Sequence, residues 1–129
     1  MPLTLTYGSF DLLHYGHINL LAKASSLGLP LAVGLSTDEF NSKKGKISSQ
    51  SYLERKFLLS QISNVKIIFP ENSWEQKIED VKKYDAQYFV MGSDWEGEFN
   101  YLNEYTKVVY FERTPIISSS EIKKIVDLK

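Results

Sequence analysis

The sequence contains no cysteine, so it offers neither a disulfide framework nor a zinc site built on thiolates. It also lacks long apolar runs, and no stretch approaches the roughly 18 residues that a membrane-spanning helix requires. No basic segment followed by an apolar one opens the chain, so we expect no secretory signal and a cytoplasmic location. The formal net charge is only −1, which excludes an overall basic field for nucleic acid. Any bound anion must therefore be held by a local cluster of donors.

What the chain does contain is an ordinary globular composition, with 43% hydrophobic and 24% charged residues. Its length of 129 residues is enough for one sizeable core. Because no internal repeat or linker divides the sequence, we expect a single domain over residues 1–129.

Short apolar runs alternate with segments of helical periodicity along the chain. Strands are predicted at residues 3–7, 31–35, 65–69, 88–91 and 108–111. Helices are predicted at residues 16–26, 52–62, 73–84 and 120–128, with a flexible loop at 42–51. The third helix is predicted from Ser73 as N-cap and Gln76 three residues later, which is a capping-box pattern. This alternation favours an α/β, Rossmann-like three-layer sandwich with a mostly parallel five-stranded sheet.

In such folds, ligands bind beyond the carboxyl ends of the strands. The residues that follow the predicted strands are polar and show no periodicity. They are residues 8–11, 36–38, 92–95 and 112–118. The ligand position expected for this fold and the polar composition therefore indicate the same segments as a binding site.

The segment YGSFDLLHYGH follows the first predicted strand and leads into a helix. The start of a helix has unpaired N–H groups and a partial positive charge, and so favours phosphate. His14 and His17, the only two histidines, are three residues apart and can donate to the same oxygens. Gly16 between them allows a phosphate to approach the backbone closely.

Two other interpretations of the histidine pair are open. A lone His-x-x-His is often an ordinary surface feature. A metal site is also open, but with two histidines and no cysteine it would have to be completed by carboxylates. The position of the whole segment after a predicted strand favours phosphate binding over both.

The motif resembles the signature of the HxGH nucleotidyltransferase superfamily, and the chain is most similar to its glycerol-phosphate cytidylyltransferases. The resemblance extends over nearly the whole length, through STDEFN, the loop with Lys44 and Lys46, Tyr52 with Arg55 and Lys56, PENSWEQK, VMGSDWEG and RTPIISSS. It implies that CTP and a glycerol phosphate react to give CDP-glycerol and pyrophosphate. The acceptor is the 3-phosphate in most of the family, and the 2-phosphate is kept as an alternative.

The resemblance also implies the roles of individual residues. The catalytic residues would be His14, His17, Lys46 and Arg113. CTP would contact these and Ser9, Phe10, Tyr15, Gly16, Asp94, Thr114, Ile117, Ser118, Ser119 and Ser120. Lys44 and Lys77 would hold the acceptor's phosphate, with Arg55 nearby. A Mg²⁺ ion is expected with the phosphates, with Asp11 as its carboxylate neighbour, and a homodimer is expected.

Several positions depart from the family pattern. Ser9 stands where threonine is usual, and Ser93 where many members have a second aspartate. Ile116 replaces a glycine, although a β-branched residue cannot easily adopt positive φ. Ser63 and Lys66 replace an arginine and an aspartate, a departure that bears on the expected dimer and on the choice of acceptor.

Two further hypotheses stand beside cytidylyl transfer to a glycerol phosphate. The chain could transfer a cytidylyl or adenylyl group to another phosphorylated alcohol. It could also be a non-catalytic nucleotide-binding module that has kept the fold. A tRNA-synthetase fragment is disfavoured, because the chain is short and not basic. CDP-glycerol would serve teichoic acid or capsular polysaccharide synthesis.

Overall fold

The computed structural model describes residues 2–112. The first half contains β1 (Leu3–Gly8), α1 (Tyr15–Ser25), β2 (Leu31–Ser36), α2 (Asp38–Lys43) and α3 (Tyr52–Ser60). The second half contains β3 (Val65–Glu71), α4 (Lys77–Lys83), β4 (Ala86–Gly92), the 3₁₀ helices η1 (Ser93–Trp95) and η2 (Asn100–Glu104), and β5 (Lys107–Phe111). The helix predicted at 120–128 lies outside the described residues.

The five strands form one sheet in the order β3-β2-β1-β4-β5, and every neighbouring pair is parallel. The predicted parallel α/β sheet is therefore confirmed. From β1 the chain first adds strands on one side and then, after β3, on the other. Such a reversal opens a crevice at the carboxyl ends of the central strands, where α/β proteins bind ligands.

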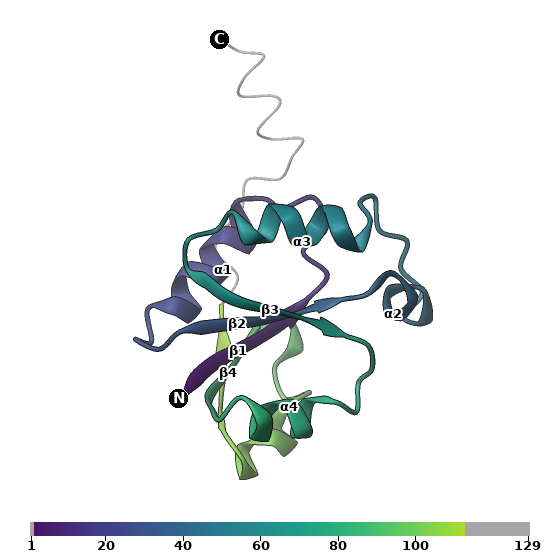
Figure 1. Ribbon diagram of the computed structural model, residues 1–129. Helices are drawn as coiled ribbons and strands as arrows, with labels where there is room; N and C mark the ends of the chain where they lie inside the picture. Colours follow the sequence, from purple (N-terminus) through teal and green to yellow (C-terminus); the bar gives the residue numbers. More distant parts are fainter. Residues whose placement is uncertain (1, 113–129) are drawn as a thin grey trace.

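Helices cover both faces of the sheet, with α1 and α3 on one side and α4 on the other (Figure 1). An apolar core lies on each face. On one face, Leu21 of α1 and Leu59 of α3 are fully buried. On the other, Val81 of α4 and Leu102 of η2 pack in the core that contains Leu5. The central strands are covered on both faces, which explains their continuous apolar runs. This arrangement is the three-layer sandwich that the sequence predicted.

The boundaries of two predicted segments, the loop at 42–51 and the strand at 65–69, are wrong. The loop predicted at 42–51 begins inside a helix, since α2 runs to Lys43 and is capped by Thr37, whose hydroxyl accepts from the Phe40 amide. Strand β3 does not stop at Pro70 but continues to Glu71. A proline is tolerated there because β3 is an edge strand of the sheet.

The helix predicted from Ser73 begins later, at Lys77. The Gln76 side chain accepts from the amides of Asn72 and Ser73 and donates to the Asp80 carboxylate. The Ser–Gln pattern thus closes the turn that precedes the helix. The turn sets the position of Lys77 relative to the end of β3.

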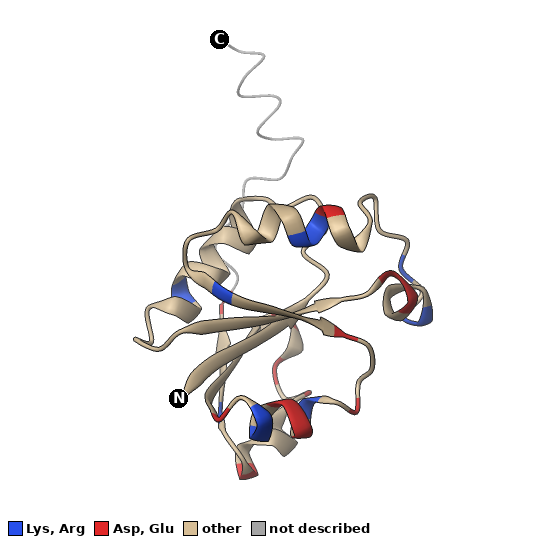
Figure 2. Cartoon of the chain, in the orientation of Figure 1, with Lys and Arg blue, Asp and Glu red and all other residues tan. Residues whose placement is uncertain are grey.

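Charged side chains of both signs share the same elements, as α3 and α4 show in Figure 2. Within residues 2–112, no helix is long and apolar enough to cross a membrane.

Candidate active site

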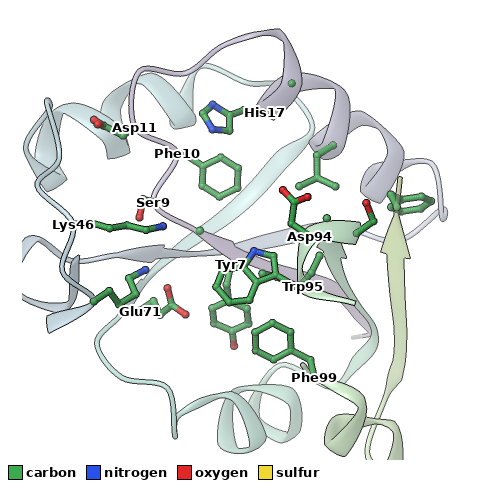
Figure 3. A pocket seen from close by; sticks show the side chains of 18 of the residues that line it. Tyr7, Ser9, Phe10, Asp11, His17, Lys46, Glu71, Asp94, Trp95 and Phe99 are labelled. Atoms are coloured by element: carbon green, nitrogen blue, oxygen red, sulfur yellow. The ribbon is translucent and has the colours of Figure 1, made fainter. Parts of the chain in front are cut away.

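A cavity of about 630 Å³ opens at the carboxyl ends of the strands. Its volume is in the range of sites for small organic ligands. Ten of the residues predicted from the sequence line it: Ser9, Phe10, Asp11, His14, Gly16, His17, Lys44, Lys46, Lys77 and Asp94. Figure 3 shows His17, Lys46, Asp94 and Glu71 around this space. The structure thus brings together predicted residues that are up to 85 positions apart in the chain (residues 9 and 94).

The turn after β1 has a strained backbone. Phe10 and Leu12 have φ angles of 48° and 49°, in the left-handed region that ordinary residues seldom adopt. Such residues cost on the order of 1–3 kcal/mol each and persist where their surroundings hold them. Burial of the Phe10 ring holds the first, and the Gln50 side chain, which accepts from the Leu12 amide, holds the second. The turn therefore has a defined shape at the entrance to α1.

The two histidines cap the start of α1. Nδ1 of His14 accepts from the Gly16 amide at 3.0 Å, and Nδ1 of His17 accepts from the His14 amide at 3.2 Å. The two rings stack, with their centroids 3.9 Å apart. The capping-box geometry usually made by a hydroxyl and a carboxylate is made here by two imidazoles.

These bonds decide which nitrogen of each ring can donate. A nitrogen that accepts carries no proton, so in the neutral ring the proton is on Nε2. Burial, with the neighbouring His14 as a second cause, lowers the pKa of His17 to about 4. At neutral pH, His17 is therefore an uncharged Nε2–H donor at the rim of the cavity.

A group of side chains ties the turn to the loop that carries Lys46. The Asp11 carboxylate accepts from the amides of Ser49 and Gln50, at 2.8 and 3.0 Å. The buried Asn41 accepts from the Ser9 hydroxyl and donates to Ser48. The loop thus lies beside the turn, which places Lys46 near Ser9 (Figure 3).

Arg55, predicted near the acceptor, is not among the residues that line the cavity. Its side chain is buried, and it donates to the backbone carbonyls of Ser9, Ser36 and Gln50. It also pairs with Asp38 at 2.7 Å. The Tyr52 amide first, and Arg55 second, lower the pKa of Asp38. Arg55 therefore fixes the ends of β1 and β2 from behind the site.

The predicted acceptor lysines meet around a buried carboxylate. Glu71, at the end of β3, pairs with Lys77 at 2.5 Å and accepts from the Ser36 hydroxyl at 2.5 Å. The Lys44 ammonium donates to the same hydroxyl at 3.1 Å. Burial lowers the pKa of Lys44, and the charge of Glu71 opposes this. We call Ser36, Lys44, Glu71 and Lys77 the lysine corner.

Sequence reasoning assigned no role to Glu71 or Trp74, although both line the cavity. A signal for Glu71 was available, because it directly follows an apolar strand and a proline. Trp74 lies within cation–π distance of both corner lysines, 5.0 Å from Lys77 and 5.7 Å from Lys44. At the other end of the cavity, Asp94 lies beside Trp95, just after β4 (Figure 3).

Other predicted residues are not among those that line the cavity. Tyr15 is exposed at the start of α1 and is not a lining residue. Arg113, Thr114 and residues 117–120, all predicted to bind CTP, lie outside the described residues, as does Ile116.

The described part of the chain holds no cluster of three or more His, Asp or Glu side chains that could bind a metal ion. Both Asp11 oxygens already accept backbone amides, although each keeps a further lone pair. The residues therefore suit Mg²⁺ held mainly by substrate phosphates, with one carboxylate. They do not provide a protein cage for an ion.

A parallel sheet whose carboxyl-end cavity combines a helix start with lysines is the arrangement by which α/β proteins bind phosphate-bearing ligands, nucleotides among them. The model of one family, described as Cytidylyltransferase-like, matches residues 5–125. The chain belongs to this family. The family assignment agrees with the resemblance carried by the sequence motifs.

Close relatives share nearly the whole chain. The glycerol-3-phosphate cytidylyltransferase of Bacillus spizizenii is 53% identical over 124 residues, covering 96% of each chain. The protein of the same name from Staphylococcus aureus is 50% identical, over 96% of this chain and 94% of the relative. A crystal structure of the lipopolysaccharide core biosynthesis protein from Thermoplasma volcanium has the same fold, with a TM-score of 0.73 and 23% identity over 87% of this chain and 97% of that one.

Proposed function

We propose that this chain transfers the cytidylyl group of CTP to a glycerol phosphate, giving CDP-glycerol and pyrophosphate. The observation that carries the proposal is a single cavity with two sets of donors. His14 and His17 lie at the helix start. Lys44 and Lys77 line the same cavity beside Glu71, which lies away from His17 in Figure 3. Relatives of about half-identical sequence, named for this reaction, support it.

The chemistry suits such a site because the acceptor needs no activation. A phosphate monoester is largely dianionic at neutral pH, since its second pKa is about 6. One of its oxygens attacks the α-phosphorus of CTP, and the bond from that phosphorus to the bridging oxygen breaks. The electron pair leaves on pyrophosphate. The protein has to align two anions and spread the charge that develops on the leaving group.

Each set of donors meets one of these needs. The Nε2–H groups of His14 and His17 and the ammonium group of Lys46 would contact the triphosphate. Lys44 and Lys77 would hold the phosphate of the acceptor. Asp94 would accept from the amino group of cytosine. Arg113 would complete the triphosphate site, as the family resemblance implies.

We also propose that Mg²⁺ enters with CTP. The ion would neutralise charge on the phosphates. Asp11 is the carboxylate expected beside it, while its main contacts keep the loop of Lys46 in place. If the ion is required, EDTA abolishes turnover and added Mg²⁺ restores it.

The proposal is tested by pyrophosphate release from CTP, ATP, GTP and UTP with a panel of acceptors. The panel contains glycerol 3-phosphate, glycerol 2-phosphate and other polyol phosphates. We expect CTP with a glycerol phosphate to give the highest kcat/KM. Release with ATP alone would indicate adenylyl transfer, and no release with any pair would favour a binding module.

We further propose a homodimer, as the family resemblance implies. Leu53 and Phe57 expose apolar side chains on the outer face of α3, where they would be covered by a second copy. Light scattering after size exclusion tests this. The wild type should have twice the mass of the Phe57→Glu variant, and a monomeric wild type would refute it.

We propose a cytoplasmic location, where CTP is available, and no binding of nucleic acid, because the net charge is −1. CDP-glycerol would then donate glycerol phosphate to a surface polymer such as teichoic acid or capsular polysaccharide.

A further inference from the structure

The lysine corner is held together by one carboxylate that serves both lysines. Lys77 and Glu71 are 1% and 2% exposed, and they form a direct ion pair. Lys44 reaches the same carboxylate indirectly, because Ser36 accepts from Lys44 and donates to Glu71. The Lys77 ammonium is also surrounded by the rings of Tyr7, Trp74 and Phe99. Its nitrogen lies 4.6, 5.0 and 5.6 Å from their centroids. A buried ammonium among aromatic rings depends strongly on its carboxylate.

The sheet itself places this carboxylate. Ser36 and Glu71 are register partners at the ends of β2 and β3. Their side chains therefore lie side by side on rigid strands, which position a site better than a loop does. Gly34 contributes, because a Cβ there would come within 2.4 Å of the Tyr7 ring that covers Lys77.

The two lysines keep donors for a ligand. A lysine ammonium has three N–H groups. The structure gives Lys77 one hydrogen bond to Glu71 and Lys44 one to Ser36. Two ammonium groups and one carboxylate also leave the corner with a charge of +1, so it still attracts an anion.

We propose that Glu71 is a positioning residue for the acceptor: it holds Lys77 directly and Lys44 through Ser36, so that both ammonium groups face the acceptor's phosphate. This inference rests on the proposed function. It adds a residue that neither binds the phosphate nor takes part in bond making. Its effect reaches the acceptor through the lysines.

The test compares steady-state kinetics of Glu71→Gln with the wild type. The amide keeps the size of the side chain but carries no negative charge, so the ion pair with Lys77 is lost. We expect the KM for glycerol phosphate to rise about tenfold or more, while the KM for CTP and the kcat at saturation change less than about threefold. Glu75→Gln, an exposed site on the following turn, is the matched control and should behave as the wild type.

A double-mutant cycle shows whether Glu71 acts through Lys77. Lys77→Met should itself raise the acceptor KM. If Glu71 works largely by positioning Lys77, adding Glu71→Gln to that variant raises this KM by a clearly smaller factor than it does in the wild type, because only the route through Ser36 and Lys44 remains. An equal factor in both backgrounds would overturn the proposal, because Glu71 would then not act through Lys77.

Three other outcomes are decisive. An acceptor KM of Glu71→Gln close to that of the wild type, or an equal rise in the KM of both substrates, overturns the inference and leaves the proposed function standing. A wild type without turnover on any glycerol phosphate overturns the proposed function, and the inference with it.

Should Glu71→Gln fail to fold, as judged by circular dichroism, Ser36→Ala replaces it. That variant should raise the acceptor KM through Lys44, and an unchanged KM would refute the proposal.

Discussion

The two sides of the cavity are built from interactions of different range. At the start of α1, the histidines are held by bonds that span two and three residues. In the lysine corner, Ser36 and Glu71 are 35 residues apart, and they meet because β2 and β3 pair in a particular register. The side proposed for the triphosphate is thus a local motif, whereas the side proposed for the acceptor is a product of the sheet.

This difference indicates that the histidine side serves the transfer reaction, whereas the lysine corner sets the specificity for the acceptor. A turn and a helix start can bind a phosphate in many proteins, since N–H donors suffice. The corner combines side chains from β2, β3, α4 and the loop after α2, so it can select an acceptor of particular shape and charge. Perturbing the histidines should therefore lower kcat, whereas perturbing the lysine corner should raise the KM for the acceptor.

Replacing His17 by alanine should lower kcat by about a hundredfold or more, because it removes a donor to the transition state. The fold should persist, since the lost contacts are local. Stopped assays of pyrophosphate release measure the rate, and thermal melting checks the fold. His14→Ala should behave alike. Turnover close to that of the wild type in either variant would refute the central role of the pair.

Replacing Arg55 by methionine should lower the free energy of unfolding by about 3 kcal/mol, because three backbone carbonyls lose the guanidinium that donates to them and Asp38 loses its charge partner. Lys56→Met, next to it and exposed on α3, is the control and should be nearly neutral. Urea denaturation measures both. If Arg55→Met matched the control in stability but lost affinity for glycerol phosphate, a direct role in acceptor binding would be restored.

Replacing Asp11 by asparagine should raise the KM for CTP by about three- to tenfold, because an amide has one acceptor oxygen for the two backbone amides that the carboxylate binds. The KM should be measured at several Mg²⁺ concentrations. A defect that excess Mg²⁺ fully corrects would show that Asp11 acts through the metal rather than through the loop.

The smallest expected effect concerns pH. The pKa of His17 is lowered from 6.5 to about 4 in the folded chain, so below pH 6.5 the unfolded chain binds more protons at this residue. Its contribution to stability is therefore complete above pH 6.5 and is lost as the pH falls towards 4. The Tm of the wild type should fall over this range more than that of His17→Gln. Parallel curves for the two proteins would contradict the lowered pKa.

Much of this molecule could be predicted from the sequence. Alternating apolar runs and helical segments were enough for the parallel α/β sheet, because strand and helix periodicities are local properties. The motif from Ser9 to His17 was enough to place the two histidines at a helix start beside the cavity, where we propose that phosphate binds. Within this motif the histidines are held by hydrogen bonds to residues two and three positions away, so their spacing in the sequence largely determines their geometry.

The tertiary structure alone decided which charged residues face the cavity and which support it from behind. Arg55, Lys44 and Lys77 look alike in the sequence, yet Arg55 bonds to backbone carbonyls while the lysines line the cavity. Glu71 shows the same limit, since its partners depend on strand register and on where α4 begins. The register of β2 against β3 and the first residue of α4 are set by packing across the whole sheet. They cannot be predicted from the neighbouring residues in the sequence.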